Sequence, residues 1–210
     1  MLLIALALAA EPARPAAPPR NVSLEAGLGL GLLGGGNGSG YAIGASQRFG
    51  LDVPAGHIHS IVLAVEHAHH VLADSRGYLP DEDVPDDVIE GARDRWQVTV
   101  GGRFQLQLAD PTADRLVVEP LAEIGMGFVA THTVVVMPSF SGRMAIGSWN
   151  VAPALGLGLG ADVRVRRFLA FVPALRVTAA LEQDPPEAGG PSIFGAEVRG
   201  DLSVSARVTF

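Results

Sequence analysis

The sequence finishes with "DLSVSARVTF", residues 201–210, in which polar and apolar side chains alternate up to the last residue. The apolar members are Leu202, Val204, Ala206, Val208 and Phe210. Successive side chains of a β-strand point to opposite sides, so a period of two is the pattern of a strand with two different faces. The stretch predicts a strand that runs as far as an aromatic residue.

The same period runs through about eight segments from Asn21 onward. In "NVSLEAGLGLGL", residues 21–32, aliphatic residues share one face, while Ser23, Glu25 and glycines share the other. A helix would scatter both sets around its axis. The sequence therefore predicts an all-β fold, an eight-stranded antiparallel up-and-down transmembrane β-barrel, in which an even number of strands closes the sheet.

Composition bounds the class of protein. The chain has 210 residues, 48% hydrophobic content and a mean hydropathy of +0.31, which suits one domain. No apolar run approaches the roughly 20 residues of a membrane-spanning helix. A net charge of -7 without any Lys/Arg-rich run argues against nucleic acid. The lack of cysteine excludes disulfides and thiolate zinc sites, and it permits export.

Three segments are expected along the chain. Residues 1–10, "MLLIALALAA", have the apolar core and the small-x-small pattern of a signal peptide. The usual positive n-region is missing, so a truncated signal peptide is expected. A buried N-terminal helix is the alternative. Residues 11–20, "EPARPAAPPR", form a proline-rich lead-in. Residues 21–210 form the barrel.

The second face of the strands carries charges of both signs. A soluble lipocalin-like barrel would turn the aliphatic face inward and bind an apolar ligand, whereas a transmembrane barrel turns the charges inward. Loop lengths favour the membrane: short turns are expected at residues 52–57, 109–114 and 164–167, and long loops at 72–94, 131–147 and 182–195. The predicted interior charge network comprises Glu25, Arg48, Glu66, Arg103, Glu119, Glu123, Arg176, Arg199, Asp201 and Arg207. Glu197 lies on the same face of its predicted strand.

With these features the chain resembles the small eight-stranded outer-membrane barrels, the class of the membrane domain of outer-membrane protein A and of the OmpW- and OmpX-like proteins. The resemblance covers most of residues 21–210. It implies a location in the bacterial outer membrane, among lipid and lipopolysaccharide. It also implies that Leu202, Val204, Ala206, Val208 and Phe210 form a C-terminal assembly signal for the barrel-assembly machinery.

Two departures qualify the pattern. Pro153 and Pro173 fall inside predicted strands, where every N–H should be paired, so they predict bulges or shifted strand ends. His67 and His69 fall on the predicted lipid face, which suggests that their strand has left the hydrocarbon by that point.

An eight-stranded barrel is just wide enough for its own side chains, and an unpaired buried charge is costly. We therefore expect charge pairs to plug the interior and the protein to have a structural or envelope-interaction role, with outer loops that bind lipopolysaccharide or another envelope protein. The alternative is a narrow channel for small or hydrophobic solutes, helped by inward glycines. Neither catalysis nor a cofactor is expected.

Some motifs suggest other chemistry. The histidines His67, His69, His70 and His132 are weak candidates for a zinc or copper site near the outer end. The alternative is that they are ordinary histidines at the membrane interface, without a metal. The loop acids Asp81, Glu82, Asp83, Asp86 and Asp87 could attract divalent cations, but they lack EF-hand spacing, so a solvated loop is expected.

Two further motifs are weaker still. "HIHS" supplies His57, His59 and Ser60 for lipid hydrolysis, yet no acidic partner is in reach. "GLGLLG" matches the dinucleotide-binding spacing of glycines, but it lies in a predicted strand with no helix to receive a phosphate. Neither motif predicts a site.

Overall fold

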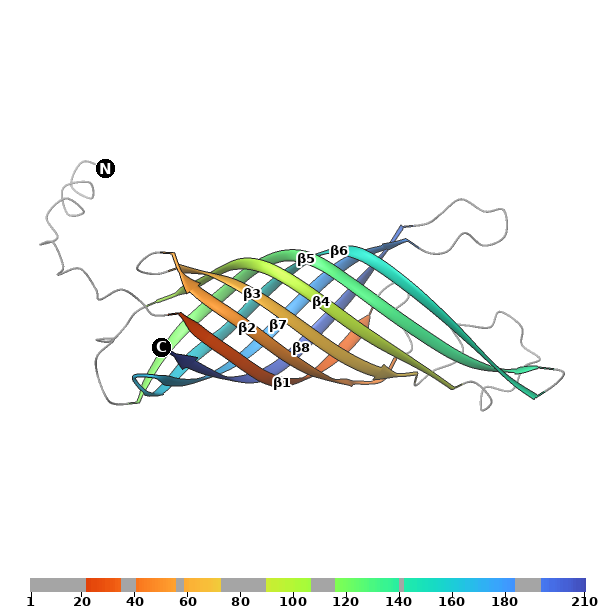
Figure 1. Ribbon diagram of the computed structural model, residues 1–210, viewed down its shortest axis with the longest axis horizontal. Coiled ribbons are helices and arrows are strands. Elements are labelled where there is room, and N and C mark those ends of the chain that lie inside the picture. The colour runs from red at the N-terminus through yellow and green to blue at the C-terminus, as the bar shows by residue number, and fades with distance from the viewer. Residues whose placement is uncertain are drawn as a thin grey trace, which may run out of the picture.

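The computed structural model describes residues 22–34, 41–55, 59–72, 90–106, 116–139, 142–183 and 194–210. Within these ranges eight antiparallel strands form one closed barrel (Figure 1), which confirms the predicted fold class. The strands are β1 (Ser23–Gly34), β2 (Gly44–Pro54), β3 (His59–Val71), β4 (Glu90–Gln105), β5 (Val117–Ser139), β6 (Gly142–Arg166), β7 (Leu169–Gln183) and β8 (Phe194–Thr209). Among the described residues, no helix has the length and apolar character needed to cross a bilayer.

The alternation seen in the sequence separates the two faces of the wall. On β1, Leu28 and Leu30 leave more than half of their surface exposed outside the barrel, whereas Glu25 is buried inside. On β8, Leu202 is exposed outside and Asp201 is buried inside. The aliphatic face thus points away from the barrel, so the lipocalin-like alternative is wrong.

The seam between β1 and β8 closes the sheet. Their ladder runs from Ser23 opposite Thr209 to Gly34 opposite Val198. The backbone N–H of Phe210 donates to the carbonyl oxygen of Val22 at 3.1 Å. Because the last strand pairs with the first, neither presents an open edge to lipid along this seam.

The two ends of the barrel differ in height. We call the end that carries Ser23 and Thr209 the terminal end, and the opposite one the far end. At the far end β5 and β6 pair with each other as far as Ser139 opposite Gly142 and extend beyond the other strands (Figure 1). The expected loop at residues 131–147 is therefore mostly strand, and the loop expected at 72–94 is too long because β4 starts at Glu90.

Neither proline ends a strand. Pro153 pairs with Phe128 on β5 and lies one residue beyond the β6–β7 ladder, which starts at Ala154. Pro173 pairs with Val204 on β8, and on its other side the β6–β7 pairs skip from Gly160–Ala174 to Val163–Phe171. Each proline thus keeps one regular ladder and lies where the other is interrupted, as the missing N–H requires.

Candidate functional site

Charged side chains fill the inside of the barrel. The ten predicted network residues all lie on the inward face, and all are buried except Glu123, which is partly exposed. They occupy successive levels along the barrel axis, and each level combines cations with anions.

The middle level is centred on Arg103 of β4. Its guanidinium donates to Glu25 Oε2 at 2.6 Å, to Asp52 Oδ2 at 2.8 Å and to Glu123 Oε1 at 2.6 Å. Arg176 of β7 donates to the second oxygen of Glu123 at 2.9 Å. We call these five residues the Arg103 cluster. Its members come from β1, β2, β4, β5 and β7, so it joins opposite sides of the wall.

The terminal end has its own cluster. Gln105 donates to Glu119 and to Asp162, both at 2.7 Å, and Arg164 donates to Glu119 at 3.0 Å. Arg207 forms an ion pair with Asp162. Side chains from β4, β5, β6 and β8 therefore converge on one side of this opening.

Toward the far end, two carboxylates hold three arginines. Glu197 of β8 pairs with Arg93 at 2.6 Å and with Arg95 at 3.1 Å, both on β4. Arg199 pairs with Glu66, which lies across the barrel on β3.

Asp201 completes this level. It accepts hydrogen bonds from Arg199 at 2.7 Å and from the hydroxyl of Ser46 at 2.8 Å. Every network residue thus has at least one charged partner of opposite sign.

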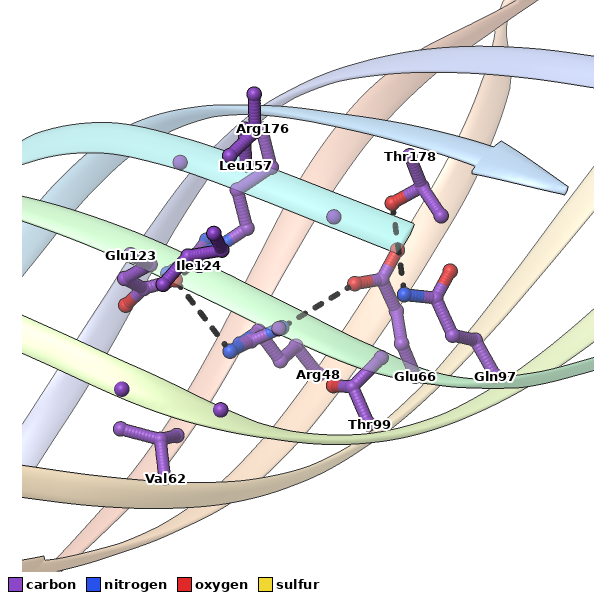
Figure 2. A pocket seen from close by; sticks show the side chains of 15 residues that line it. Arg48, Val62, Glu66, Gln97, Thr99, Glu123, Ile124, Leu157, Arg176 and Thr178 are labelled. Carbon is purple, nitrogen blue, oxygen red and sulfur yellow. Dashed lines mark hydrogen bonds and ion pairs between the residues drawn. The ribbon is translucent and has the colours of Figure 1, made fainter. Parts of the chain in front are cut away.

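A cavity of about 40 Å³ lies between the middle and far levels, beside Arg48 (Figure 2). Part of its wall is bare because Gly101, Gly125 and Gly156 are register neighbours on β4, β5 and β6. The opposite lining is polar and includes Gln97, which donates to Thr178 at 3.4 Å. A space of this size, with polar side chains along one side, has room for about three water molecules.

Arg48 is held differently from Arg103. Its nitrogens lie 3.8 Å from Glu25, 3.7 Å from Glu66 and 3.6 Å from Glu123. These are ion-pair distances beyond the range of a direct hydrogen bond. Polar groups at such separations beside a hydrated space are typically bridged by water.

Several interior charges were missed by the sequence analysis, namely Asp52, Arg93, Arg95, Asp162 and Arg164. The signal was present: continuing the period of two from Gln97 places Arg95 and Arg93 inside. The expected strands were too short at Asp52, Arg93 and Arg164, which were assigned to turns or to the loop at 72–94. Arg95 and Asp162 lay outside those turns and that loop, and their inward facing was not recognised.

Three outward histidines, His67, His69 and His132, lie at the far end of the wall formed by β3 to β6. His69, Asp94, His132 and Trp149 are consecutive register partners across these strands, and His67 is the partner of Trp96. The Oδ1 atom of Asp94 lies 2.8 Å from His69 Nδ1 and 3.3 Å from His67 Nε2. His67 stacks on Trp96 with ring centroids 4.2 Å apart, and His132 stacks on Trp149 at 4.5 Å. We call these six residues the His–Trp patch.

Asp94 lies beyond the membrane-spanning part of β4. A spanning strand needs about 9–11 residues, and the outward apolar positions of β4 already fill that length between Trp96 and Leu106. Partial burial raises the pKa of Asp94, but hydrogen bonds from His69 and His67 outweigh that effect and hold the pKa below its ordinary value. The carboxylate is therefore charged at neutral pH.

The four weak metal candidates do not converge. His70 points into the barrel, where it is buried and its Nδ1–H donates to the carbonyl of Ala42 at 3.1 Å. His67, His69 and His132 point outward. In the described part of the chain no group of three His, Cys, Asp or Glu side chains is placed to hold a metal ion.

Ser60 is buried on the inward face of β3 while His59 is exposed on the other face, so they do not form a Ser–His pair. Gly29, Gly31 and Gly34 lie in β1. His57, the acidic residues 81–87 and the expected segments 1–10 and 11–20 lie outside the described residues.

A closed eight-stranded barrel with an aliphatic exterior and a charged interior has the architecture of the small transmembrane β-barrels. No protein-family model matches the chain, and no curated protein matches it.

Solved structures are similar in fold. Neisserial surface protein A (NspA) is 16% identical, with a TM-score of 0.54 over 90% of this chain and 97% of that one. A major outer membrane protein from Thermus thermophilus is 15% identical, with a TM-score of 0.53 over 90% and 99%. The outer membrane protein OprG from Pseudomonas aeruginosa is 11% identical, with a TM-score of 0.51 over 93% and 99%. The chain thus has the fold of eight-stranded outer-membrane barrels.

Proposed function

We propose that the protein is a bacterial outer-membrane barrel whose interior is closed by ion pairs and whose role is structural or interactive within the envelope. The exterior supports the membrane location: Leu28, Leu155 and Leu202 are each exposed by more than 60%, and such a surface is stable only in lipid. Outer-membrane barrels have short turns on the periplasmic side and long connections on the outer side. The terminal end therefore faces the periplasm, and the far end, with its long β5–β6 hairpin, faces outside.

The contacts of the Arg103 cluster are the main support for a closed interior. One guanidinium reaches carboxylates of β1, β2 and β5, and Arg176 extends the cluster to β7. A solute or ion could pass only if these pairs separated. Separating a buried pair costs several kcal/mol because it leaves uncompensated charges.

The test is conductance in planar bilayers after refolding. Folding is verified first by a heat-dependent shift in gel mobility and by β-type circular dichroism. We expect no discrete conductance steps from the folded protein. Regular steps from a preparation that passes both folding checks would contradict the closed interior and establish a channel.

A narrow solute path is the second candidate, and the cavity beside Arg48 favours it. Charged and polar side chains line one side of that cavity, and its glycine-lined wall leaves space that side chains fill elsewhere in the barrel. A path would also have to cross the levels on both sides of the cavity, where Arg103 and Arg199 make direct contacts with carboxylates. This candidate requires conductance by the unmodified protein.

A catalytic role has no support at "HIHS", because Ser60 and His59 face opposite sides of β3. Release of fatty acid from lipid vesicles that depends on Ser60 would contradict a purely structural role. Ser60→Ala is the variant for that assay.

A further inference from the structure

The His–Trp patch is an unusual part of the outer wall. On β1, β7 and β8 the outward residues near the far end are aliphatic and exposed, among them Leu32, Leu181 and Val198. Over β3 to β6 the outward surface instead carries imidazoles, a carboxylate and two indoles. Polar groups of this kind are costly in hydrocarbon, so this side of the barrel meets polar surroundings at the edge of the lipid-facing band.

The rings of the patch are held in place. His67 stacks on Trp96 at an interplanar angle of 28°, and His132 stacks on Trp149 at 18°. Trp96 remains 48% exposed and Trp149 66% exposed, so both indoles keep surface available to a neighbour. Rings fixed before binding lose little conformational entropy when a ligand packs on them.

Hydrogen-bonding groups lie between the two indoles. Asp94 shares its Oδ1 atom between His67 and His69, and it is the direct register partner of His132. Its side chain is 37% exposed, so it can also accept hydrogen bonds from a ligand. Flat apolar faces beside a few placed polar groups form the usual lining of a site for an amphipathic small molecule.

The composition of the patch selects among membrane components. It contains no lysine or arginine, which are the residues that recognise phosphate strongly. A sugar ring fits better, because its C–H face can pack on an indole while its hydroxyls bond to Asp94 and the imidazoles. The patch faces sideways from the wall, toward neighbouring lipid, rather than along the barrel axis.

We propose that the His–Trp patch binds a sugar ring of lipopolysaccharide beside the barrel in the outer leaflet. This inference rests on the proposed outer-membrane location with the far end outside. It assigns one side of the barrel, β3 to β6, as the side that holds the glycolipid.

Intrinsic fluorescence tests the inference directly, because the chain has two tryptophans and both belong to the patch. The protein is refolded into phosphatidylcholine vesicles and titrated with purified lipopolysaccharide, or with phosphatidylglycerol at the same added charge. We expect a saturable change in tryptophan emission with lipopolysaccharide and none with phosphatidylglycerol. Equal responses to the two lipids would overturn the inference.

Variants separate the patch from general lipid effects. Asp94→Ala keeps both tryptophans and should weaken the apparent affinity for lipopolysaccharide about tenfold, the effect of roughly one lost hydrogen bond to a charged group. Leu32→Ala, on the aliphatic side, is the matched control and should leave the affinity unchanged. Unchanged affinity in Asp94→Ala would contradict the proposed site.

Two further readouts keep the outcomes distinct. Failure of the unmodified protein to insert, seen as no heat-dependent gel shift, would overturn the membrane location itself. Insertion without selectivity for lipopolysaccharide would overturn only the sugar site. An emission change that instead follows protein concentration in pure phosphatidylcholine would assign the patch to contact between two copies and overturn the glycolipid proposal.

Discussion

Two arginines of the same interior differ in how tightly they are held. Arg103 makes direct hydrogen bonds to Glu25, Asp52 and Glu123, whereas Arg48 lies 3.6–3.8 Å from its carboxylates beside the cavity. A planar guanidinium has five donors in a fixed fork and can serve several carboxylates at once, whereas an ammonium has three donors on a single nitrogen. Arg103 is therefore the residue on which the closed interior depends most.

Replacing Arg103 by methionine should destabilise the folded barrel by about 3–5 kcal/mol, because Glu25, Asp52 and Glu123 lose their shared cation. Urea unfolding in lipid vesicles, followed by tryptophan fluorescence, measures the loss. Arg103→Lys keeps the positive charge but loses the forked arrangement of donors, so its stability should lie between that of the unmodified protein and that of the methionine variant. A loss below about 1 kcal/mol for the methionine variant would show that water or Arg176 takes over the pairing.

Replacing Arg48 by alanine should affect conductance more than stability. The substitution enlarges the 40 Å³ cavity and removes a cation without breaking a direct hydrogen bond. We expect brief conductance events in planar bilayers that the unmodified protein does not show. A silent Arg48→Ala barrel, verified as folded, would mean that the neighbouring levels block passage by themselves.

At the scale of the strands, glycines decide where neighbouring backbones approach each other. A Cβ added to Gly127 of β5 would lie 1.9 Å from the carbonyl oxygen of Val98, and one added to Gly101 of β4 would lie 2.1 Å from that of Ile124. These contacts are with backbone, which cannot rotate away as a side chain can. Strand packing between β4 and β5 thus requires glycine at Gly101 and Gly127. The other two glycines of the bare cavity wall, Gly125 and Gly156, have room for a Cβ, whose nearest neighbours would lie at 3.4 Å and 3.7 Å.

Gly127→Ala should therefore destabilise the barrel by about 1–3 kcal/mol, the usual cost of overpacking. Gly200→Ala on β8 is the control, since a Cβ there meets nothing within 4 Å. The control should be neutral or slightly stabilising, because glycine is unfavourable within strands. Equal urea midpoints for the two variants would contradict the packing argument.

Strand existence followed from the sequence far better than strand length. The alternation placed all ten network residues on the inward face, because a strand's facing is set by parity alone. The outer part of the β5–β6 hairpin was missed because Val134, Val135 and Val136 do not alternate with polar residues, although they pair with both β4 and β6. The sharing of Asp94 by His67 and His69 depends on the β3–β4 register, which parity does not give.

At the scale of the whole molecule, the closed sheet and the aliphatic outer surface together favour insertion into lipid. The β1–β8 seam removes the last open edge, and the aliphatic exterior makes lipid the favourable surrounding. The same strand that closes the seam carries the proposed assembly signal, with Leu202, Val204, Val208 and Phe210 exposed on the outer face. The seam and the signal can be separated, since Phe210 lies just past the β1–β8 ladder and adds one backbone hydrogen bond to it, at Val22.

Deleting Phe210 should leave refolding in detergent intact and lower the amount of barrel assembled in cells several-fold. The ladder from Ser23–Thr209 onward remains, so the deleted protein should still show the heat-dependent gel shift after refolding. Recovery from outer-membrane fractions of an expressing Gram-negative host measures assembly. Phe168→Ala is the control, because it removes a similarly exposed aromatic side chain at the terminal end and leaves the sequence of β8 unchanged; the backbone hydrogen bond from Thr209 N–H to the carbonyl of residue 168 is kept. If both variants lost assembly equally, the effect would belong to apolar area at this end rather than to recognition of the final residue. If the deletion also failed to refold in detergent, Phe210 would act by closing the seam.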